Sequence, residues 1–219
     1  MVKIRPSASF PDLRLAKVSI VHGRHLPSWE AAGAIYHIAL HLADSVPQTQ
    51  LDVWRAERER LTVRAREDQR PLSAEESGEL KAAYEKHVER YLAAGYGECL
   101  LRNAEAAQAL ASVLDRFDGE QYVLHEWCIM PNHVHIIVGG FPPEIQMRNV
   151  LATWKRVSGH AINRMIGRSG EVWHKDGYTR IIRDRAEYGH QMSYVWNNPE
   201  LAGLAKGFLR KKFVGTDCP

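Results

Sequence analysis

The chain has 219 residues, of which 45% are hydrophobic and 25% charged, a composition that excludes a wholly disordered or collagen-like chain. No apolar run reaches the roughly 18 residues needed to cross a bilayer, and no secretory signal is visible at the N-terminus, so we expect no membrane partner. The formal charge of +3 divides unevenly, with −4 over residues 1–144 and +7 over residues 145–219, and this basic third suggests a polyanion such as nucleic acid as partner.

The N-terminal part of the chain contains one strong element. Residues 1–32 show little periodicity and are expected to form an irregular lead-in. Residues 34–43 are an almost continuous apolar run, which predicts a buried strand. The strand must stop before Pro47, because proline cannot donate a hydrogen bond to a ladder.

Residues 50–94 are rich in charged side chains and predict a helical hairpin inserted into the fold. Ser73 and Glu76 have the spacing of a capping box, in which each side chain binds a backbone N–H at a helix start. The two charged helices would join at Pro71. Two interpretations stay open for this hairpin, namely a solvated decoration without chemistry and an addition that contacts DNA.

The remaining elements alternate between helix and strand. They are a helix over 104–117, strands over 121–130 and 133–138 with a tight connection at Pro131-Asn132, a helix over 144–167, a strand over 178–182, a helix over 185–197 closed by Asn198-Pro199, and a basic tail from 206. This order predicts an α+β fold, an antiparallel sheet with helices mainly on one face.

Two histidines on the strand over 133–138 are the sharpest chemical feature. Because side chains alternate along a strand, His133 and His135 share one face, while Val134, Ile136 and Val138 face the core. Two imidazoles so placed can share a divalent metal if a third ligand comes from elsewhere. The alternative is a pair of surface histidines without a ligand.

The last helix carries a second candidate group. Tyr194 and Asn198 are four residues apart and share one helix face, with His190 one turn earlier. A deprotonated tyrosine is a nucleophile for phosphate esters, and an amide oxygen is a hard donor that suits Mg²⁺ or Mn²⁺. The alternative for Tyr194 is a packed aromatic residue.

Basic and aromatic side chains of the C-terminal third form a candidate DNA-binding set. The basic members are Arg148, Lys155, Arg156, Arg180, Arg183, Arg185, Lys206, Arg210, Lys211 and Lys212. Trp154, Trp173 and Trp196 could supply aromatic surface for stacked bases, although most tryptophans belong to a core. A solvated basic face without a ligand would have the same composition.

Three cysteines, Cys99, Cys128 and Cys218, are odd in number and widely spaced. They make neither a disulfide framework nor a C-x-x-C metal site. We therefore expect reduced thiols in a cytoplasmic protein.

The motifs together resemble a known family. Residues 130–138 read Met-Pro-Asn-His-Val-His-Ile-Ile-Val, and residues 194–199 read Tyr-Val-Trp-Asn-Asn-Pro. With the segment 177–184, they resemble the REP-associated tyrosine transposases, IS200-like members of the superfamily of HUH endonucleases. The resemblance extends over residues 34–47 and 95–205. It implies one transposase domain over 1–219, with a core at about 33–47 and 95–205, the insertion at 50–94 and a tail at 206–219.

The resemblance also implies an activity. The fold would be ferredoxin-like, with His133, His135 and Asn198 binding Mg²⁺ or Mn²⁺. Tyr194 would attack a DNA phosphate, form a 5′-phosphotyrosine link and free a 3′-hydroxyl. The substrate would be single-stranded DNA folded into imperfect hairpins, as in palindromic repeats. Both monomers and homodimers fit the pattern.

Two other functions remain open. A domesticated protein could bind hairpin DNA without cutting it, and it would keep the basic third. A metal phosphoesterase with water as nucleophile would use the histidine pair but leave Tyr194 unexplained. The presence of His133, His135 and Tyr194 together favours the tyrosine enzyme.

Overall fold

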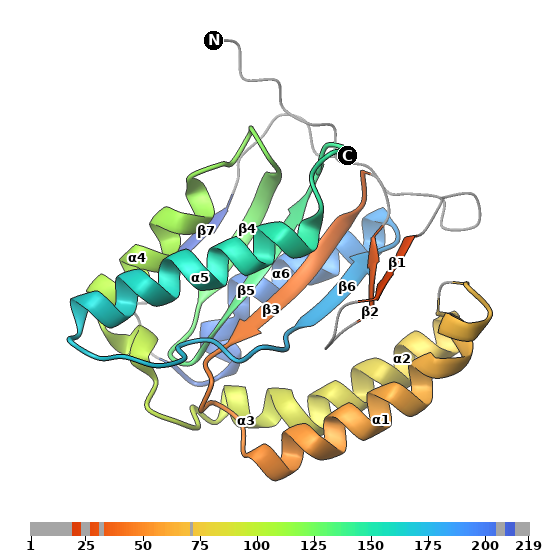
Figure 1. The fold of residues 1–219 in the computed structure, drawn as a ribbon, viewed down its shortest axis with the longest axis horizontal. Helices are drawn as coiled ribbons and strands as arrows, with labels where there is room; N and C mark the ends of the chain where they lie inside the picture. The colour runs from red at the N-terminus through yellow and green to blue at the C-terminus, as the bar shows by residue number, and fades with distance from the viewer. Residues whose placement is uncertain (1–18, 23–26, 31–32, 71, 205–208, 213–219) are drawn as a thin grey trace.

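The computed structural model describes residues 19–22, 27–30, 33–70, 72–204 and 209–212. Its centre is a five-stranded sheet with the strand order β6-β3-β5-β4-β7, in which every neighbouring pair is antiparallel (Figure 1). The strands are β3 (Ile35–His41), β4 (Val123–Ile129), β5 (His133–Gly139), β6 (Tyr178–Ile182) and β7 (Arg210–Lys212). The predicted α+β class with an antiparallel sheet is confirmed.

One face of the sheet packs against α4 (Ala104–Asp115) and α5 (Met147–Met165), which lie side by side in front of the strands in Figure 1. α4 begins at Asn103, whose side chain accepts hydrogen bonds from two backbone N–H groups of the first turn. The short turn η2 (Leu100–Arg102) precedes it. Strand side chains such as Ile38, Val134 and Ile136 fill the core beneath these two helices.

The opposite face packs against α6 (Arg185–Leu201). Asp184 caps this helix, and its Met192 and Val195 pack on Ile35 and Ile137 of the sheet. The helices therefore cover both faces, whereas the sequence suggested that they lie mainly on one. Both faces of the central strands are consequently covered, and every residue of β3 and β5 is buried.

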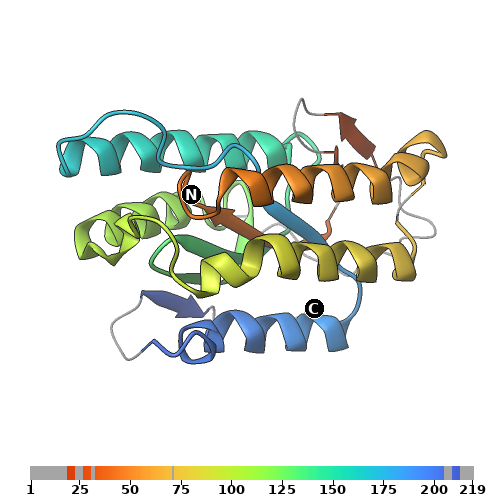
Figure 2. The same cartoon turned by 90° about the horizontal axis from the view of Figure 1, so that it is seen from below.

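The segment between β3 and α4 forms a helical hairpin. Its first arm is α1 (Gln48–Glu67), and its second runs through α2 (Ala74–Tyr84), the π-helical turn η1 (Glu85–Glu89) and α3 (Arg90–Ala93). The capping box of Ser73 and Glu76 is present at the start of α2. Seen from below, the hairpin lies between α5 and α6 (Figure 2). Its apolar side chains pack on Ala39 and Tyr178 of the sheet, on the face that α6 also covers.

Three short features differ from the sequence expectations. Within the expected irregular lead-in, β1 (Ser19–His22) and β2 (Pro27–Glu30) pair as an antiparallel hairpin. Within the expected basic tail, β7 adds an edge strand to β4. These strands have three or four residues, too few for a period-2 pattern to be recognised.

The helix α6 was expected to close at Asn198-Pro199 but continues to Leu201. Proline lacks an N–H group, so Pro199 removes only the hydrogen bond to the carbonyl of Val195. The last turn is completed by the N–H of Ala202, which donates to the carbonyl of Asn198 at 3.0 Å. The loss of one bond near the end of a helix is tolerated, so the helix runs on.

No helix in the described part of the chain is both long and apolar enough to cross a membrane.

Candidate active site

The histidine pair lies on β5, on the face of the sheet that carries α6. Val134 and Ile136 point to the core under α4 and α5, so His133 and His135 point the other way, as alternation requires. Both side chains are buried, and their Nε2 atoms lie 3.1 Å apart. Two ring nitrogens therefore converge on one point.

The protonation state of His133 follows from its neighbour. The Asn132 side-chain nitrogen donates to the carbonyl of Tyr96 at 3.0 Å, so its oxygen is the atom that faces His133. That oxygen accepts from Nδ1 of His133 at 2.8 Å. Since a neutral imidazole carries one proton, we assign that proton to Nδ1. The Nε2 atom of His133 then presents a lone pair.

His37 of β3 bonds Nδ1 of His135, as Asn132 bonds Nδ1 of His133. Its Nε2 lies 3.0 Å from Nδ1 of His135, and a further side-chain hydrogen bond joins His37 to Gln191 of α6. When His135 Nδ1 donates to His37, the Nε2 atom of His135 is also a bare lone pair. Two lone pairs that face each other at 3.1 Å repel unless a cation or a proton lies between them.

Burial keeps these rings neutral. It lowers the pKa of His135 to about 4. It also lowers the pKa of His133 and of His37 well below the usual value, and the neighbouring His135 adds to both shifts. Neutral imidazoles have the free lone pairs that a metal requires.

The tyrosine helix α6 completes this group. The ring centroid of Tyr194 lies 5.5 Å from that of His135 and 5.9 Å from that of His37. Asn198, one turn later, is buried and forms a side-chain hydrogen bond with His133, while Asn197 is exposed. One helix of the same chain thus brings both Tyr194 and Asn198 to the histidine pair.

The donor set fits a divalent cation. Adjacent ligands of an octahedral Mg²⁺ at about 2.1 Å are about 3 Å apart, close to the 3.1 Å that separates the two Nε2 atoms. The Asn198 amide adds a hard oxygen beside His133. No cluster of three or more His, Cys, Asp or Glu side chains suited to a metal occurs among the described residues. A third protein donor beside the two histidines would be the amide of Asn198.

A cavity lies in front of this group, between α6, the sheet and the hairpin. Its lining residues on the sheet are His37, His135 and Tyr178, and those on α6 are His190, Gln191 and Tyr194. From the hairpin it is lined by Lys81, Tyr84, Glu85 and Glu89. Its volume of about 40 Å³ holds a few water molecules.

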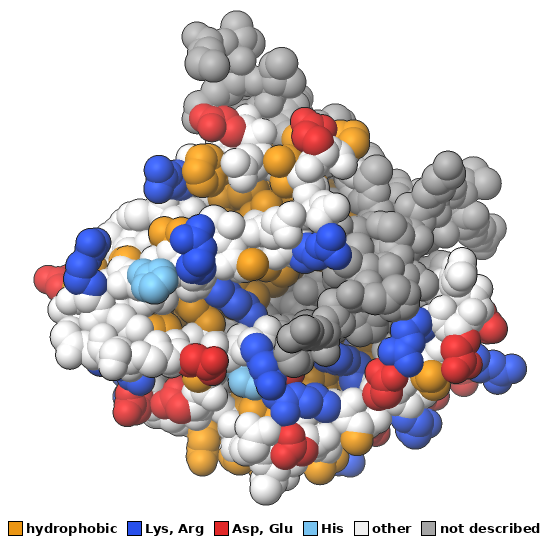
Figure 3. All heavy atoms as spheres, in the orientation of Figure 1, with side chains coloured by type: hydrophobic (Ala, Val, Ile, Leu, Met, Phe, Trp, Pro, Cys, Tyr) orange, Lys and Arg blue, Asp and Glu red, His pale blue; other side chains and the backbone are white. Residues whose placement is uncertain are grey.

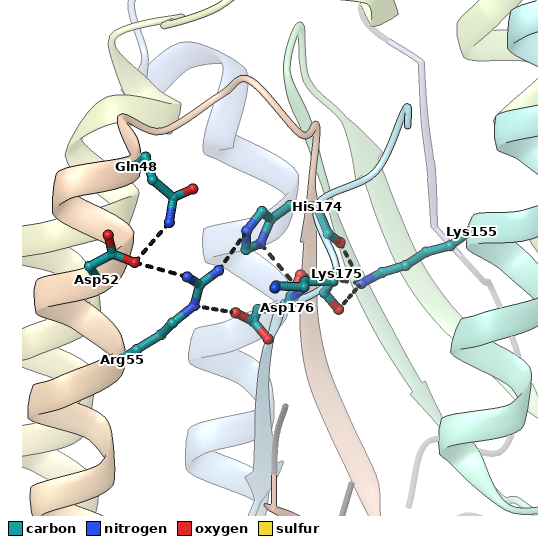
Figure 4. A network of polar contacts seen from close by, with 7 residues as sticks. All are labelled: Gln48, Asp52, Arg55, Lys155, His174, Lys175 and Asp176. Atoms are coloured by element: carbon teal, nitrogen blue, oxygen red, sulfur yellow. Dashed lines mark hydrogen bonds and ion pairs between the residues drawn. The ribbon is translucent and has the colours of Figure 1, made fainter. Parts of the chain in front are cut away.

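A second polar group joins the loop before β6 to α1 and α5 (Figure 4). His174 stacks on His41, the β3 residue that pairs with His133, with ring centroids 4.7 Å apart. Arg55 of α1 donates to the Asp176 carboxylate at 2.9 Å and contacts His174 at 3.1 Å. The loop before β6 is therefore tied to both the sheet and the hairpin.

The basic residues of α5 lie away from the histidine pair. Arg148 and Arg156 are exposed on a helix that packs on the far face of the sheet. Figure 3 shows Lys and Arg side chains dispersed over that face among acidic and apolar ones. Lys155 is engaged within the fold, since its Nζ donates to the carbonyls of residues 174–176 at 2.9 to 3.2 Å. Burial lowers the pKa of Lys155 to about 8. A DNA contact by Lys155 does not fit this placement.

Three basic residues lie in or just after β6 and at the start of α6, and one of them lines the cavity. Arg180 lines it and donates to the Glu187 carboxylate at 2.7 Å. Arg183 contacts the hydroxyl of Ser77 in α2, which ties α2 to this end of the sheet. Arg185 is exposed at the start of α6.

The residues of β7 alternate between the two faces. Arg210 and Lys212 lie over the ring of Trp196, at 4.2 and 6.0 Å from its centroid. Lys211 points the other way and pairs with Asp115 of α4 at 2.7 Å. Lys206 lies outside the described residues.

Two of the three tryptophans expected near DNA belong to the core. Trp154 and Trp173 are buried in the cluster under α5, so they offer no surface to a base. Trp196 is partly exposed beside the cations of β7. Cys99 and Cys128 are free thiols and buried, while Cys218 lies outside the described residues.

Three residues of the site were not singled out in the sequence. They are His37, Asn132 and Gln191, and each holds a histidine of the site through a hydrogen bond. In the sequence, His37 is marked only as a polar residue within the apolar run 34–43. Its partner His135 lies 98 residues away, and only the pairing of β3 with β5 brings them together.

The chain is similar to known proteins over the part that contains this site. Residues 98–198 match the family model described as "Transposase IS200 like". No curated protein matches the chain. A solved structure titled "Structure of the REP associates tyrosine transposase bound to a REP hairpin" is similar at 15% identity and a TM-score of 0.45, over 82% of this chain and 74% of that chain. The matched residues 98–198 contain His133, His135, Tyr194 and Asn198, so all four candidate residues lie in the part of the chain that is similar to the IS200-like transposase family.

Proposed function

We propose that the protein is a metal-dependent, single-tyrosine endonuclease that cuts and rejoins single-stranded DNA. The observation that supports this most is the position of Tyr194 beside His135, in one cavity of an IS200-like transposase domain. The hydroxyl oxygen of Tyr194 attacks a backbone phosphorus, and the bond from phosphorus to the 3′-oxygen breaks. The 5′-phosphate stays on the tyrosine.

The attack of Tyr194 exchanges one phosphate ester bond for another and moves one proton. The tyrosine hydroxyl releases its proton to water, and the 3′-oxygen takes up a proton and leaves as a hydroxyl. One phosphate ester replaces another, so the 3′-hydroxyl of a DNA strand can reverse the step without ATP. The protein is therefore both a nickase and a strand transferase.

The chain itself orients the reacting groups. His133, His135 and Asn198 would hold Mg²⁺ or Mn²⁺, while Asn132 and His37 fix the two imidazoles through their other ring nitrogens. The bound metal supplies Lewis acidity that offsets the charge developing on the scissile phosphate. Tyr194 lies on the same helix as Asn198, so α6 sets the distance between nucleophile and phosphate.

We further propose that the substrate is a hairpin-forming palindromic repeat, as for the REP-associated transposases that the motifs resemble. The net charge of +7 over residues 145–219 supports a polyanionic partner. Arg183, Arg185 and Lys212 lie around α6, the helix that carries Tyr194, and we expect them to contact the DNA backbone.

The second candidate is a protein that binds hairpin DNA without cutting it. It needs the basic surface but neither Tyr194 nor the two converging lone pairs. The geometry of those three side chains favours the enzyme.

The test is a covalent-adduct assay. The purified protein is mixed with Mn²⁺ and single-stranded imperfect hairpin oligonucleotides labelled at the 3′-end, and the products are run on a denaturing gel. A labelled protein band is expected for the native chain and for Tyr96→Phe, an exposed control tyrosine, but not for Tyr194→Phe. A native-gel shift without any adduct would favour the binding protein. Cleaved DNA without an adduct would favour water as the nucleophile.

A further inference from the structure

The helical hairpin forms one wall of the active-site cavity. Lys81, Tyr84, Glu85 and Glu89 line it from the hairpin, facing Tyr194 and the other α6 side chains that line it. Whatever enters the cavity to reach the tyrosine therefore also meets the hairpin.

This wall is held in place by packing. Tyr84 stacks on Tyr178 of β6 with ring centroids 4.3 Å apart, and Trp54 contacts Tyr84 edge-on at 5.5 Å. The other arm of the hairpin is tied down by the ion pair of Arg55 with Asp176 at 2.9 Å. The hairpin is thus docked on the sheet by two independent contacts.

The π-helical turn η1 lies at the cavity. Such turns interrupt an α-helix at a cost and are frequent at functional sites. The turn runs from Glu85 to Glu89, and both ends of it line the cavity.

The charges on this wall decide what it can bind. Lys81 pairs with Glu85 at 3.3 Å, and Arg180 pairs with Glu187 at 2.7 Å. Among the residues that the structure describes, Glu89 has no ion pair. A carboxylate without a cation repels the phosphates of a DNA backbone and accepts N–H donors instead.

A second observation points to a missing ligand. Tyr84 lines the cavity, and its hydroxyl is buried without a hydrogen-bond partner in the described part of the chain. Tyr84 is only 3% exposed. Leaving a buried hydroxyl unpaired is costly, so this group calls for a polar partner.

We propose that this wall reads a base of the single strand next to the phosphate that Tyr194 attacks, with Glu89 accepting from the base edge and the Tyr84 hydroxyl as a second polar contact. The inference rests on the proposed function, since it places the single strand in this cavity. It assigns the hairpin to base recognition, in place of a solvated decoration without chemistry.

The hydrogen-bonding groups of the four bases predict which of them Glu89 accepts. Cytosine and adenine present an amino group, and guanine presents two adjacent N–H donors, all of which a carboxylate accepts. The N3–H of thymine lies between two carbonyl oxygens, which a carboxylate repels. The wall therefore disfavours thymine.

The test compares binding of fluorescent oligo(dC) and oligo(dT) of equal length by anisotropy. Native protein and the isosteric Glu89→Gln variant are measured at pH 8, where Glu89 is ionised because burial raises its pKa to only about 7. Glu79→Gln is the matched control, since Glu79 is exposed on the same hairpin. Melting temperatures of the variants establish that each one folds.

The measured quantity is the ratio of the Kd for oligo(dT) to the Kd for oligo(dC). An amide donates to thymine O4 as readily as it accepts from cytosine, so the ratio should fall about fivefold to tenfold in Glu89→Gln. The ratio should stay unchanged in Glu79→Gln. An unchanged ratio in a folded Glu89→Gln variant overturns the inference. Because the assay needs no cleavage, a fall in the ratio without any adduct supports the inference even where the proposed nuclease activity fails.

Discussion

Nε2 of His133 and Nε2 of His135 face each other at 3.1 Å, while the Nδ1 atom of each ring is already engaged by another side chain. Asn132 holds the first ring and His37 holds the second. Hydrogen bonds at Nδ1 leave the two Nε2 atoms free to accept a cation. This arrangement would orient the two imidazoles toward the metal that we propose they bind, as hydrogen bonds to ligand histidines do in many metal sites.

Removing one of these ligands should abolish metal binding. In His133→Ala, two donors remain at most, so we expect no Mn²⁺ binding detectable by calorimetry and no Mn²⁺-dependent cleavage. His160→Ala is the control, because His160 is exposed on α5. Native Mn²⁺ affinity in His133→Ala would show that the metal binds elsewhere or that none is needed.

Replacing His37 should weaken the site without removing a ligand. The variant His37→Leu loses the bond to His135 Nδ1, and we expect a 10- to 100-fold lower Mn²⁺ affinity. His37→Gln keeps an acceptor and should recover part of the affinity. If the leucine and glutamine variants bind Mn²⁺ equally well, the hydrogen bond has no orienting role.

Glu126 of β4 should make stability depend on pH. Burial raises the pKa of its carboxyl to about 7, although the cations of Lys212 and Arg210 oppose the shift. The folded state therefore keeps its proton to a higher pH than the unfolded state, and stability falls as the pH rises from about 4.5 to 7. Above pH 7 the carboxyl is ionised in both states, and its burial then lowers the free energy of unfolding by the full amount.

Glu126→Gln removes that charge. We expect it to raise the free energy of unfolding at pH 8 by about 2 kcal/mol and to change it little at pH 5. Urea denaturation at the two pH values measures the difference. An equal effect at both values would mean that the carboxyl does not titrate in this range.

The contact of Arg55 with Asp176 should stabilise the docked hairpin. Asp176 is buried, so Arg55→Ala leaves a carboxylate without its ion-pair partner. We expect a loss of about 3 kcal/mol in the free energy of unfolding. Arg60→Ala, at an exposed position of α1, is the control and should change it little. Equal stabilities of the two variants would show that the docking does not depend on this ion pair.

Much of the sheet was predictable because its strands have clear local patterns. The even spacing of His133 and His135 fixed their common face, and the apolar run of β3 fixed a buried strand. The spacing of four residues placed Tyr194 and Asn198 on one face of α6. These are local properties of a period of 2 or 3.6 residues.

The other parts of the fold and of the site could not be predicted, because they depend on contacts between segments that are distant in the sequence. His37 reaches His135 only through the pairing of β3 with β5, and a histidine in an apolar run has no local sign of that partner. Lys155 has the helical position of a surface cation, yet the loop over residues 174–176 folds over it. The place of the hairpin at the cavity follows from tertiary packing alone.

The central claim is that Tyr194 is the nucleophile, and mass spectrometry of the covalent adduct tests it most directly. The adduct is trimmed with nuclease and digested with trypsin, and the peptide over residues 186–206 contains both Tyr188 and Tyr194. We expect the nucleotide on Tyr194, which lies beside His135. A nucleotide on Tyr188, whose hydroxyl bonds His125 at 2.9 Å, or an unmodified peptide, would contradict it.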